Sequence, residues 1–148
     1  MQQFDIVVIG GGLVGATFAR AVSGLGLSTL VLDHAPIESL YSQNLDNRGL
    51  ALSYTTKQIL QELQCWEKIS NKSYIIETVH VSEQQSFGFT KLEAKTYNLD
   101  ALGYVVSASD LASAIIGDLE DLSDITVLRP VIITSIDFSP TDRNWTVC

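Results

Sequence analysis

The strongest constraint on this chain is a cluster of glycines that directly follows an apolar segment. Residues 4–9 (FDIVVI) are almost all apolar and rich in β-branched side chains, a pattern typical of a strand buried on both faces of a parallel sheet. Gly10, Gly12 and Gly15 follow at once. Because glycine inside a helix or strand costs about 0.5–1 kcal/mol relative to alanine, the cluster indicates a turn whose backbone must come close to another group.

The segments beyond the glycines complete a β-α-β unit. Small and apolar residues from Leu13 onward predict a helix with a closely packed face, and Gly24 and Gly26 supply its end. Residues 28–32 (STLVL) predict a second buried strand, which is followed by Asp33. The expected fold class is therefore α/β, with a Rossmann-type β-α-β unit in a parallel sheet and antiparallel hairpins further along the chain.

The spacing Gly10-x-Gly12-x-x-Gly15 matches the dinucleotide-binding fingerprint, and it lies between a strand and a helix as that fingerprint requires. The first glycine allows a tight turn, the second lets backbone N–H groups approach a pyrophosphate, and the third lets the helix pack closely against the strands. Leu13 and Val14 begin the helix, where free N–H groups and the positive end of the helix dipole face the phosphates.

Asp33 stands where a carboxylate can accept hydrogen bonds from an adenosine ribose. Its charge also disfavours a 2′-phosphate, so NADP is not expected at this site. Gly11 is expected to be merely tolerated in the turn. Because NAD and FAD share the ADP half that these residues recognise, the fingerprint and the acid leave both ligands open.

Beyond Asp33 the β-α-β rhythm is interrupted. Residues 34–52 lack periodicity and predict a long loop, which is followed by a helix that Thr55 or Thr56 caps and that runs to about Ile69. Alternating residues then predict an antiparallel hairpin. The elements expected after residue 77 are the hairpin strands 78–83 and 87–92, a short strand at 104–106, a helix from Ser109 or Asp110 to about Leu119, and strands at 125–128, 131–138 and 144–148.

Composition excludes several classes of partner. The 148 residues carry a net charge of −8, from 17 acidic and 9 basic residues, which gives no electrostatic attraction to nucleic acid. No apolar run reaches the ~18 residues that a membrane-spanning helix needs, and the N-terminus lacks the features of a signal peptide. Cys65 and Cys148 have no metal-binding spacing, so we expect no metal site and a cytoplasmic protein with reduced thiols.

A second motif helps to decide between NAD and FAD as the ligand. Residues 46–53 (DNRGLALS), taken with GGGLVGA at 10–16, resemble the flavoprotein aromatic hydroxylases, in which a D-x-R-x-x-A-L segment follows the second strand and its loop. Residues 78–82 (TVHVS) and 101–106 (ALGYVV) look most like the hydroxylases of ubiquinone biosynthesis, in particular the 2-octaprenyl-6-methoxyphenol hydroxylase branch. The resemblance extends over nearly the whole chain.

The resemblance implies FAD as the bound dinucleotide, with Arg48 close to the flavin or its pyrophosphate, and Ser53 as either a further cofactor contact or a helix cap. It implies a monooxygenase that uses NAD(P)H and O2 to hydroxylate a polyprenylated, lipophilic phenol. No residue of this chain is identified as a catalytic acid or base. Peripheral association with the inner membrane, a multienzyme assembly and a homo-oligomer are further expectations.

The family pattern also divides the chain. Residues 1–73 are expected to begin the FAD-binding domain, 74–104 to add a hairpin to a substrate-domain sheet, and 105–148 to continue the FAD-binding domain. Relatives in this family continue for more than twice this length and carry later Asp-Gly and Gly-Asp segments for the cofactor. We therefore expect an N-terminal part that is inactive by itself. Ser107-Ala108-Ser109-Asp110 replaces an acidic or amide-bearing stretch, so no flavin contact is expected there.

Two other functions stay open from the residues alone. One is an NAD-dependent Rossmann dehydrogenase, which would continue the β-α-β rhythm beyond Asp33. The other is a non-catalytic nucleotide-binding fragment or interaction module, which would pair its open sheet edges with another copy.

Overall fold

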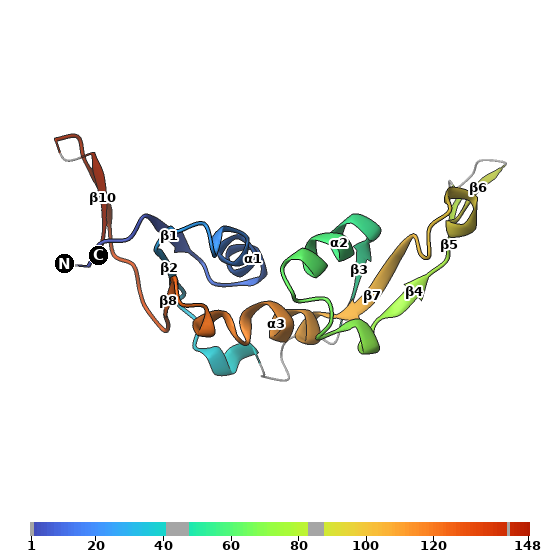
Figure 1. The fold of residues 1–148 in the computed structure, drawn as a ribbon, viewed down its shortest axis with the longest axis horizontal. Helices are drawn as coiled ribbons and strands as arrows, with labels where there is room; N and C mark the ends of the chain where they lie inside the picture. Colours follow the sequence, from blue (N-terminus) through green and yellow to red (C-terminus); the bar gives the residue numbers. More distant parts are fainter. Residues whose placement is uncertain (1, 41–47, 83–87, 142) are drawn as a thin grey trace. The chain divides into compact units, whose positions relative to one another are not determined.

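The computed structural model describes residues 2–40, 48–82, 88–141 and 143–148. The chain divides into two compact units (Figure 1). The first unit comprises Met1–Ser42 with Ile116–Cys148, and the second comprises Gln43–Ile115. Each unit contains a three-stranded sheet of its own.

A parallel sheet forms the centre of the first unit. Its strands β1 (Ile6–Ile9), β2 (Thr29–Leu32) and β8 (Ile125–Leu128) lie in the order β1-β2-β8. Helix α1 (Leu13–Val22) connects β1 to β2. The central strand β2 is the most buried of the three, as its apolar sequence predicts for a strand paired on both edges. The predicted β-α-β unit and the α/β fold class are confirmed.

Helix α1 packs through small side chains. Ala16 and Ala19 are fully buried, which allows the helix to lie close to its neighbours. Arg20 is also buried, and its guanidinium pairs with the Asp118 carboxylate. Because Asp118 precedes β8 in the sequence, this ion pair ties the two sequence segments of the unit together.

The first unit ends in an antiparallel hairpin, β9 (Ile136–Ser139) with β10 (Asn144–Val147). The strand expected at 131–138 is therefore too long at its start. Val131 donates its N–H to the Asp33 carbonyl at 2.8 Å, so this residue is tied to the end of β2 instead of the hairpin. Two short 3-10 helices complete the unit, η1 (Ile37–Leu40) and η4 (Leu119–Asp121).

An antiparallel sheet forms the second unit, in the order β3-β7-β4. Its strands are β3 (Gly49–Ser53), β4 (Tyr74–Ile76) and the central β7 (Gly103–Ser107). Helix α2 (Tyr54–Glu62) follows β3, and α3 (Ala108–Ile116) follows β7. Among the described residues of this unit, the buried apolar side chains are Leu60, Cys65, Trp66, Ile69, Ala94, Ala101, Tyr104, Val106, Leu111, Ala112, Ala114 and Ile115.

Two sequence expectations about these segments are wrong, and one strand was not predicted. The segment 34–52 is not one loop, because it contains η1 and, from Gly49, strand β3, which is ordered by pairing with β7. The helix expected to reach Ile69 ends at Glu62, and Gln64 then adopts a left-handed backbone (φ 56°) that no helix can continue through. Strand β4 has no counterpart among the predictions.

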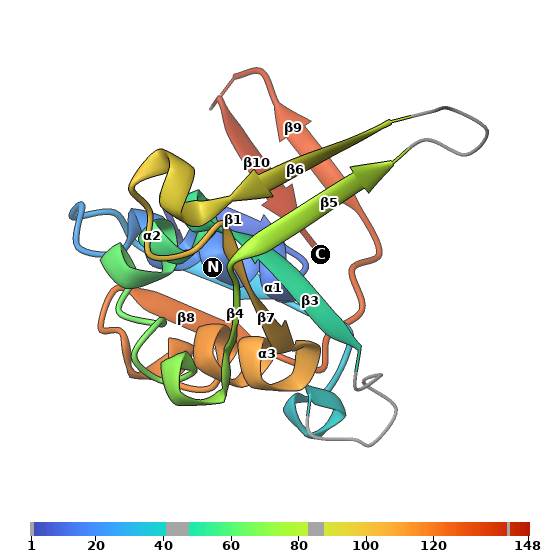
Figure 2. The same ribbon diagram turned by 90° about the vertical axis from the view of Figure 1, so that its right-hand side faces the viewer.

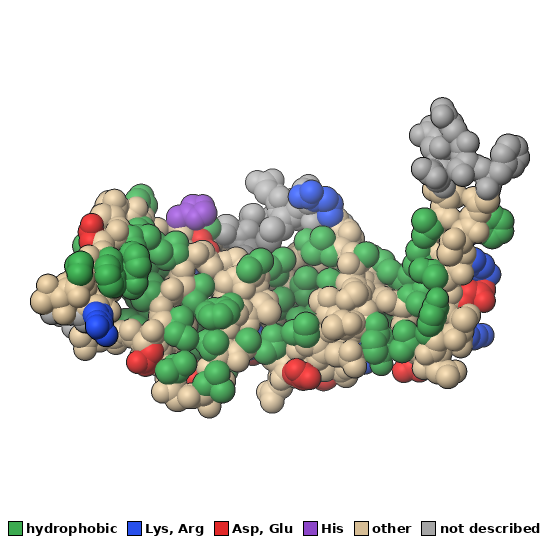
Figure 3. All heavy atoms as spheres, turned by 90° about the horizontal axis from the view of Figure 1, so that it is seen from above, with side chains coloured by type: hydrophobic (Ala, Val, Ile, Leu, Met, Phe, Trp, Pro, Cys, Tyr) green, Lys and Arg blue, Asp and Glu red, His purple; other side chains and the backbone are tan. Residues whose placement is uncertain are grey.

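The predicted hairpin is present in the second unit as β5 (Thr78–Ser82) with β6 (Phe89–Glu93). Figure 2 shows the two strands side by side, and Figure 3 shows apolar side chains over this hairpin. Val81 and Phe89 are more than half exposed, at 54% and 68%. Two further 3-10 turns lie in this unit, η2 (Ser70–Lys72) and η3 (Ala94–Tyr97).

Across the ranges that the structure describes, no helix combines the length and the apolar character needed to cross a membrane.

Candidate nucleotide-binding site

The turn between β1 and α1 is built on a backbone that needs glycine. Gly10 has a φ of +101°, a value that side-chain-bearing residues rarely adopt. Its N–H donates to the Leu32 carbonyl at 2.8 Å, which fixes the turn to the end of β2. Gly12 is the N-cap of α1, and its carbonyl accepts from the Ala16 N–H at 2.9 Å. The fingerprint therefore lies at a strand-to-helix junction, as predicted.

Gly12 and Gly15 have different roles in this junction. A Cβ placed on Gly15 would overlap the Gly10 carbonyl oxygen and lie 3.0 Å from Val8 Cγ1, so this glycine is required for packing. A Cβ placed on Gly12 would meet nothing within 4 Å. The open space at Gly12 is where a ligand can approach the backbone.

The start of α1 offers donors to a ligand at that place. The first N–H groups of a helix have no acceptor within the helix, and the first turn of α1 carries no acidic side chain. Leu13 and Val14 begin this turn, and Val14 is 85% exposed. Together with Gly10, Gly12 and Gly15, and with the apolar side chains of Val8, Ile9 and Phe18, they line a pocket beside the helix, in which the backbone N–H groups are the polar donors. The arrangement suits an anion such as a pyrophosphate.

Asp33 anchors the same turn from the end of β2. Its Oδ2 accepts from the Gly11 N–H at 2.6 Å and its Oδ1 accepts from the Ala35 N–H at 2.8 Å. The side chain is only 11% exposed, and the exposed His34 lies with its Nδ1 3.5 Å from Oδ1. Because each carboxylate oxygen has two lone pairs, Asp33 can hold the turn and still accept a ribose hydroxyl.

Arg129 is a residue of this site that the sequence analysis missed. It follows β8, and its Nη2 donates to the Gly11 carbonyl at 3.3 Å. A Cβ on Gly11 would lie 2.7 Å from this Nη2, 3.1 Å from Val31 Cγ1 and 3.3 Å from Asp33 Cβ. Gly11 is therefore closely surrounded, and a side chain there would require the Arg129 guanidinium to move. The signal available was a basic residue at the carboxyl end of a strand, where open α/β sheets bind ligands.

Arg48 and Ser53, the other two residues predicted to contact the cofactor, belong to the second unit. Arg48 is exposed, and its carbonyl accepts from the Ala108 N–H at 3.1 Å. Ser53 is the N-cap of α2, since its Oγ accepts from the Thr56 N–H at 3.1 Å. The helix-cap role is thus present for Ser53. Asp46, the first residue of the D-x-R motif, lies outside the described residues.

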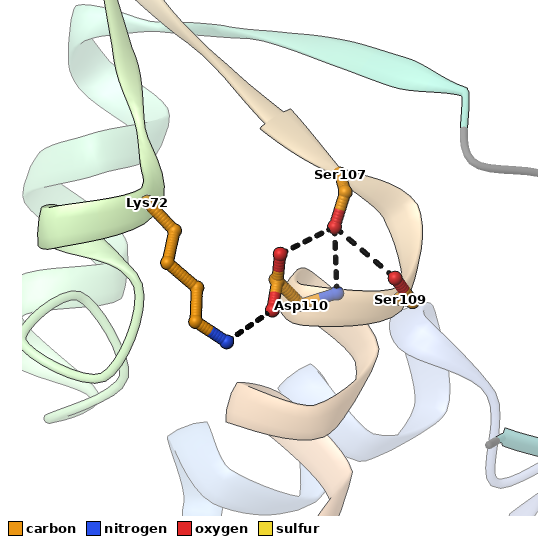
Figure 4. Close-up of polar contacts among 4 residues, drawn as sticks. All are labelled: Lys72, Ser107, Ser109 and Asp110. Atoms are coloured by element: carbon orange, nitrogen blue, oxygen red, sulfur yellow. Dashed lines mark hydrogen bonds and ion pairs between the residues drawn. The ribbon is translucent and has the colours of Figure 1, made fainter.

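The segment that departs from the family pattern forms a polar cluster with a lysine (Figure 4). Ser107 Oγ accepts from the Asp110 N–H at 3.0 Å, which caps the start of α3, and donates to Asp110 Oδ2 at 2.6 Å. Lys72 Nζ lies 2.6 Å from Asp110 Oδ1. The hydrogen bonds from Lys72 and Ser107 hold the pKa of the Asp110 carboxyl below its usual value. This cluster stabilises the helix start and lines a shallow pocket with Asn71 and Tyr74.

The described residues form no metal-binding cluster. No group of three or more histidine, cysteine or carboxylate side chains gathers there to hold a metal ion. His80 packs against Phe89 across the β5–β6 hairpin, with ring centroids 4.5 Å apart.

No family model matches this chain, but named proteins are similar to it in sequence over most of its length. It is 28% identical over 140 residues to the ubiquinone hydroxylase UbiM of Neisseria meningitidis, covering 91% of this chain and 30% of that protein. It is 31% identical over 134 residues to the human mitochondrial ubiquinone biosynthesis monooxygenase COQ6, covering 84% of this chain and 28% of that protein. The chain thus spans about a third or less of the length of these relatives.

Solved structures match its fold over nearly its full length. Pseudomonas aeruginosa PqsL, described as a probable FAD-dependent monooxygenase, matches 97% of this chain with a TM-score of 0.71 at 13% identity, over 40% of its own chain. Aklavinone-11 hydroxylase, solved with FAD and aklavinone, matches 99% with a TM-score of 0.69 at 15% identity, over 29% of its own chain. In sequence the chain is therefore a relative of the ubiquinone-biosynthesis hydroxylases, and in fold it matches flavin-dependent monooxygenases.

Proposed function

We propose that this chain forms the cofactor-binding part of an FAD-dependent monooxygenase that hydroxylates a lipophilic, polyprenylated phenol in ubiquinone biosynthesis. The observation that carries the proposal is the open backbone at Gly12, at the N-terminus of α1, beside a carboxylate that is held at the end of β2. The names of the sequence relatives support the ubiquinone pathway, and the names of the structural matches support FAD.

The residues present fit the ADP half of FAD. The cradle at Gly12 leaves space for a pyrophosphate, which the N–H groups of Leu13 and Val14 would bind, while Gly10 and Gly15 maintain the turn and its packing. Asp33 would accept from the adenosine ribose. We further propose Arg48 for the flavin or pyrophosphate, and Ser53 as a neighbouring contact. When bound, FAD would supply the redox chemistry of the reaction.

The finer assignments of this function are also proposals. NAD(P)H is the proposed electron donor, and residues 1–73 with 105–148 are proposed to belong to the cofactor-binding domain. Residues 74–104 are proposed to contribute their hairpin to a substrate-domain sheet, to which the exposed apolar side chains on β5 and β6 are suited. Association with a membrane surface or a multienzyme assembly, and pairing with a second copy, would follow from a lipophilic substrate and open strand edges.

Comparative ligand titration tests the proposal. Purified chain is titrated with FAD, FMN and NAD by equilibrium dialysis, with ADP as competitor. We expect FAD to bind and ADP to displace it, because the described site recognises the ADP half. FMN, which lacks that half, should bind at least about tenfold more weakly. Tight binding of NAD without binding of FAD would support the dehydrogenase instead, and binding of none of the three would overturn the nucleotide site.

A further inference from the structure

We propose that Arg129 is an additional nucleotide-binding residue, which supplies the positive charge that the phosphate-binding turn otherwise lacks. The inference rests on the proposed function, because it assigns a new residue to the same ADP-binding site. It concerns a side chain that follows the third strand of the first unit's sheet, far in sequence from the fingerprint.

The geometry brings Arg129 to the turn. In the order β1-β2-β8, the strand before Arg129 is two positions away from β1. The arginine side chain nevertheless reaches the turn that follows β1, where its Nη2 donates to the Gly11 carbonyl at 3.3 Å. It therefore extends past the end of β2, where Asp33 lies. A short side chain at this position would not reach the turn.

The hydrogen-bonding capacity of Arg129 is largely unused. A guanidinium has five N–H donors. Among the described residues Arg129 makes the single hydrogen bond to Gly11, and its buried Nε has no partner. Buried donors without a partner are rare in folded proteins and call for an explanation. A bound diphosphate would engage further donors of this guanidinium and draw the head group toward itself.

Charge gives the second reason. The Asp33 carboxylate accepts a hydrogen bond from the Gly11 N–H at 2.6 Å. Its negative charge therefore lies next to the place where a negatively charged pyrophosphate would bind. The first turn of α1 has no basic residue to offset it, and the helix dipole supplies only about half a positive charge. Within the described part of the first unit, Arg20 is occupied by Asp118. Arg129 is the arginine in contact with the turn, and guanidinium groups suit phosphate.

Gly11 and Arg129 are coupled by this arrangement. The guanidinium occupies the space next to the position that a Gly11 side chain would need, 2.7 Å from its Cβ. Gly11→Ala would therefore displace the guanidinium before it disturbed the strands. A side chain at position 11 would thus compete for space with an arginine 118 positions later.

Two nucleotide probes separate a charge contact from a structural role. We would compare wild-type chain with Arg129→Met, which keeps the bulk and removes the charge, and titrate each with ADP and with adenosine. Arg143→Met, on the β9–β10 turn of the same unit, is the matched control for net charge. We expect Arg129→Met to weaken ADP binding about tenfold to a hundredfold, which is the change in affinity expected on losing a hydrogen bond to a charged group. Adenosine binding should change less than about twofold, and Arg129→Lys should recover most ADP binding.

The outcomes distinguish this inference from the proposed function. Unchanged ADP binding by Arg129→Met, or an equal loss of ADP and adenosine, overturns the role of Arg129 and leaves the site intact. Failure of the wild-type chain to bind either probe overturns the proposed function together with this inference. In a double-mutant cycle, Gly11→Ala should weaken ADP binding less in the Arg129→Met background than in the wild type, and equal losses contradict the coupling.

A measurement without substitution covers the case in which Arg129→Met does not fold. The Nε–Hε NMR signal of Arg129 in the wild-type chain should shift on addition of ADP and stay unchanged on addition of adenosine. An Nε–Hε signal that ignores ADP, while ADP binds, overturns the proposal.

Discussion

Replacing Gly12 and Gly15 by alanine in turn should separate binding from stability. A methyl group on Gly12 meets nothing within 4 Å, and the backbone there (φ −73°, ψ −169°) accepts alanine. Alanine stiffens the unfolded chain but is a poorer N-cap, so the free energy of unfolding should change by less than about 0.5 kcal/mol. The methyl group would, however, fill the space through which a pyrophosphate approaches, and FAD binding should fall at least about tenfold.

Gly15→Ala should behave in the opposite way. Its methyl group would overlap the Gly10 carbonyl oxygen and crowd Val8 Cγ1 at 3.0 Å. Overpacking of this kind costs about 1–3 kcal/mol, and the better helix propensity of alanine returns up to about 1 kcal/mol. Because the overlap is with backbone, the cost should lie near the upper end of that range, so the net destabilisation should be about 2–3 kcal/mol, a fall in Tm of several degrees for a chain of this size.

Urea unfolding followed by circular dichroism gives the stability change, and FAD fluorescence gives the affinity under conditions in which each variant is folded. Binding of FAD by Gly12→Ala as tight as that by the wild type would show that a pyrophosphate does not approach the backbone at Gly12. Equal stability of Gly15→Ala and the wild type would show that the close contact of α1 with the turn is wrong.

Two further predictions concern the second unit. Lys72→Met should destabilise the chain by about 0.2–1 kcal/mol at pH 7, because Lys72 is half-exposed and its pair with Asp110 is partly screened. The pKa of Asp110 is lowered in the folded state. The stabilisation by the Lys72–Asp110 pair is therefore fully present above the unfolded-state pKa of ~4, and it disappears as the pH falls through the folded-state pKa. Urea midpoints at several pH values check this, and a difference independent of pH would contradict it. Gly103→Ala should cost about 1–3 kcal/mol, because its Cβ would overlap the Leu52 carbonyl oxygen, whereas Gly49→Ala meets only one methyl group at 3.0 Å and should cost less. Urea unfolding of both variants tests the order, and a larger loss for Gly49→Ala would show that the β3–β7 spacing is wrong.

Local patterns predict the first unit well. The run before Gly10 and the STLVL segment are both strands, as their apolar sequences predict. Burial on both faces is confirmed for β2 alone: the expectation is wrong for β1, an edge strand whose Val7 and Ile9 are 40% and 52% exposed. The glycine spacing predicts the junction at α1 correctly, because Gly10 has a positive φ and Gly15 packs where a Cβ would overlap the backbone, while Gly12 leaves open space at the start of the helix. Asp33 lies at the end of the second strand as expected, but its hydrogen bond from the Gly11 N–H was not predicted, and its contact with a ribose stays a prediction.

Long-range contacts account for what the sequence does not reveal. Arg129 contacts Gly11 across 118 positions; its place after a strand was a signal for a ligand site, but no local pattern predicts its contact with Gly11. Strands β3 and β4 are short and owe their order to pairing with β7, which is distant from both in sequence. The end of α2 depends on a single left-handed residue, Gln64, whose side chain gives no warning of it. Tertiary context decided each of these features.

The central claim is that the turn after β1, held by Asp33, binds the ADP half of FAD. Mapping backbone amide shifts of the ¹⁵N-labelled chain during titration with ADP, and then with FAD, tests this most directly. We expect both ligands to shift the same amide signals, those of Gly10 to Val14 and of Asp33. Shifts confined to other residues, or different sites for ADP and FAD, would contradict it.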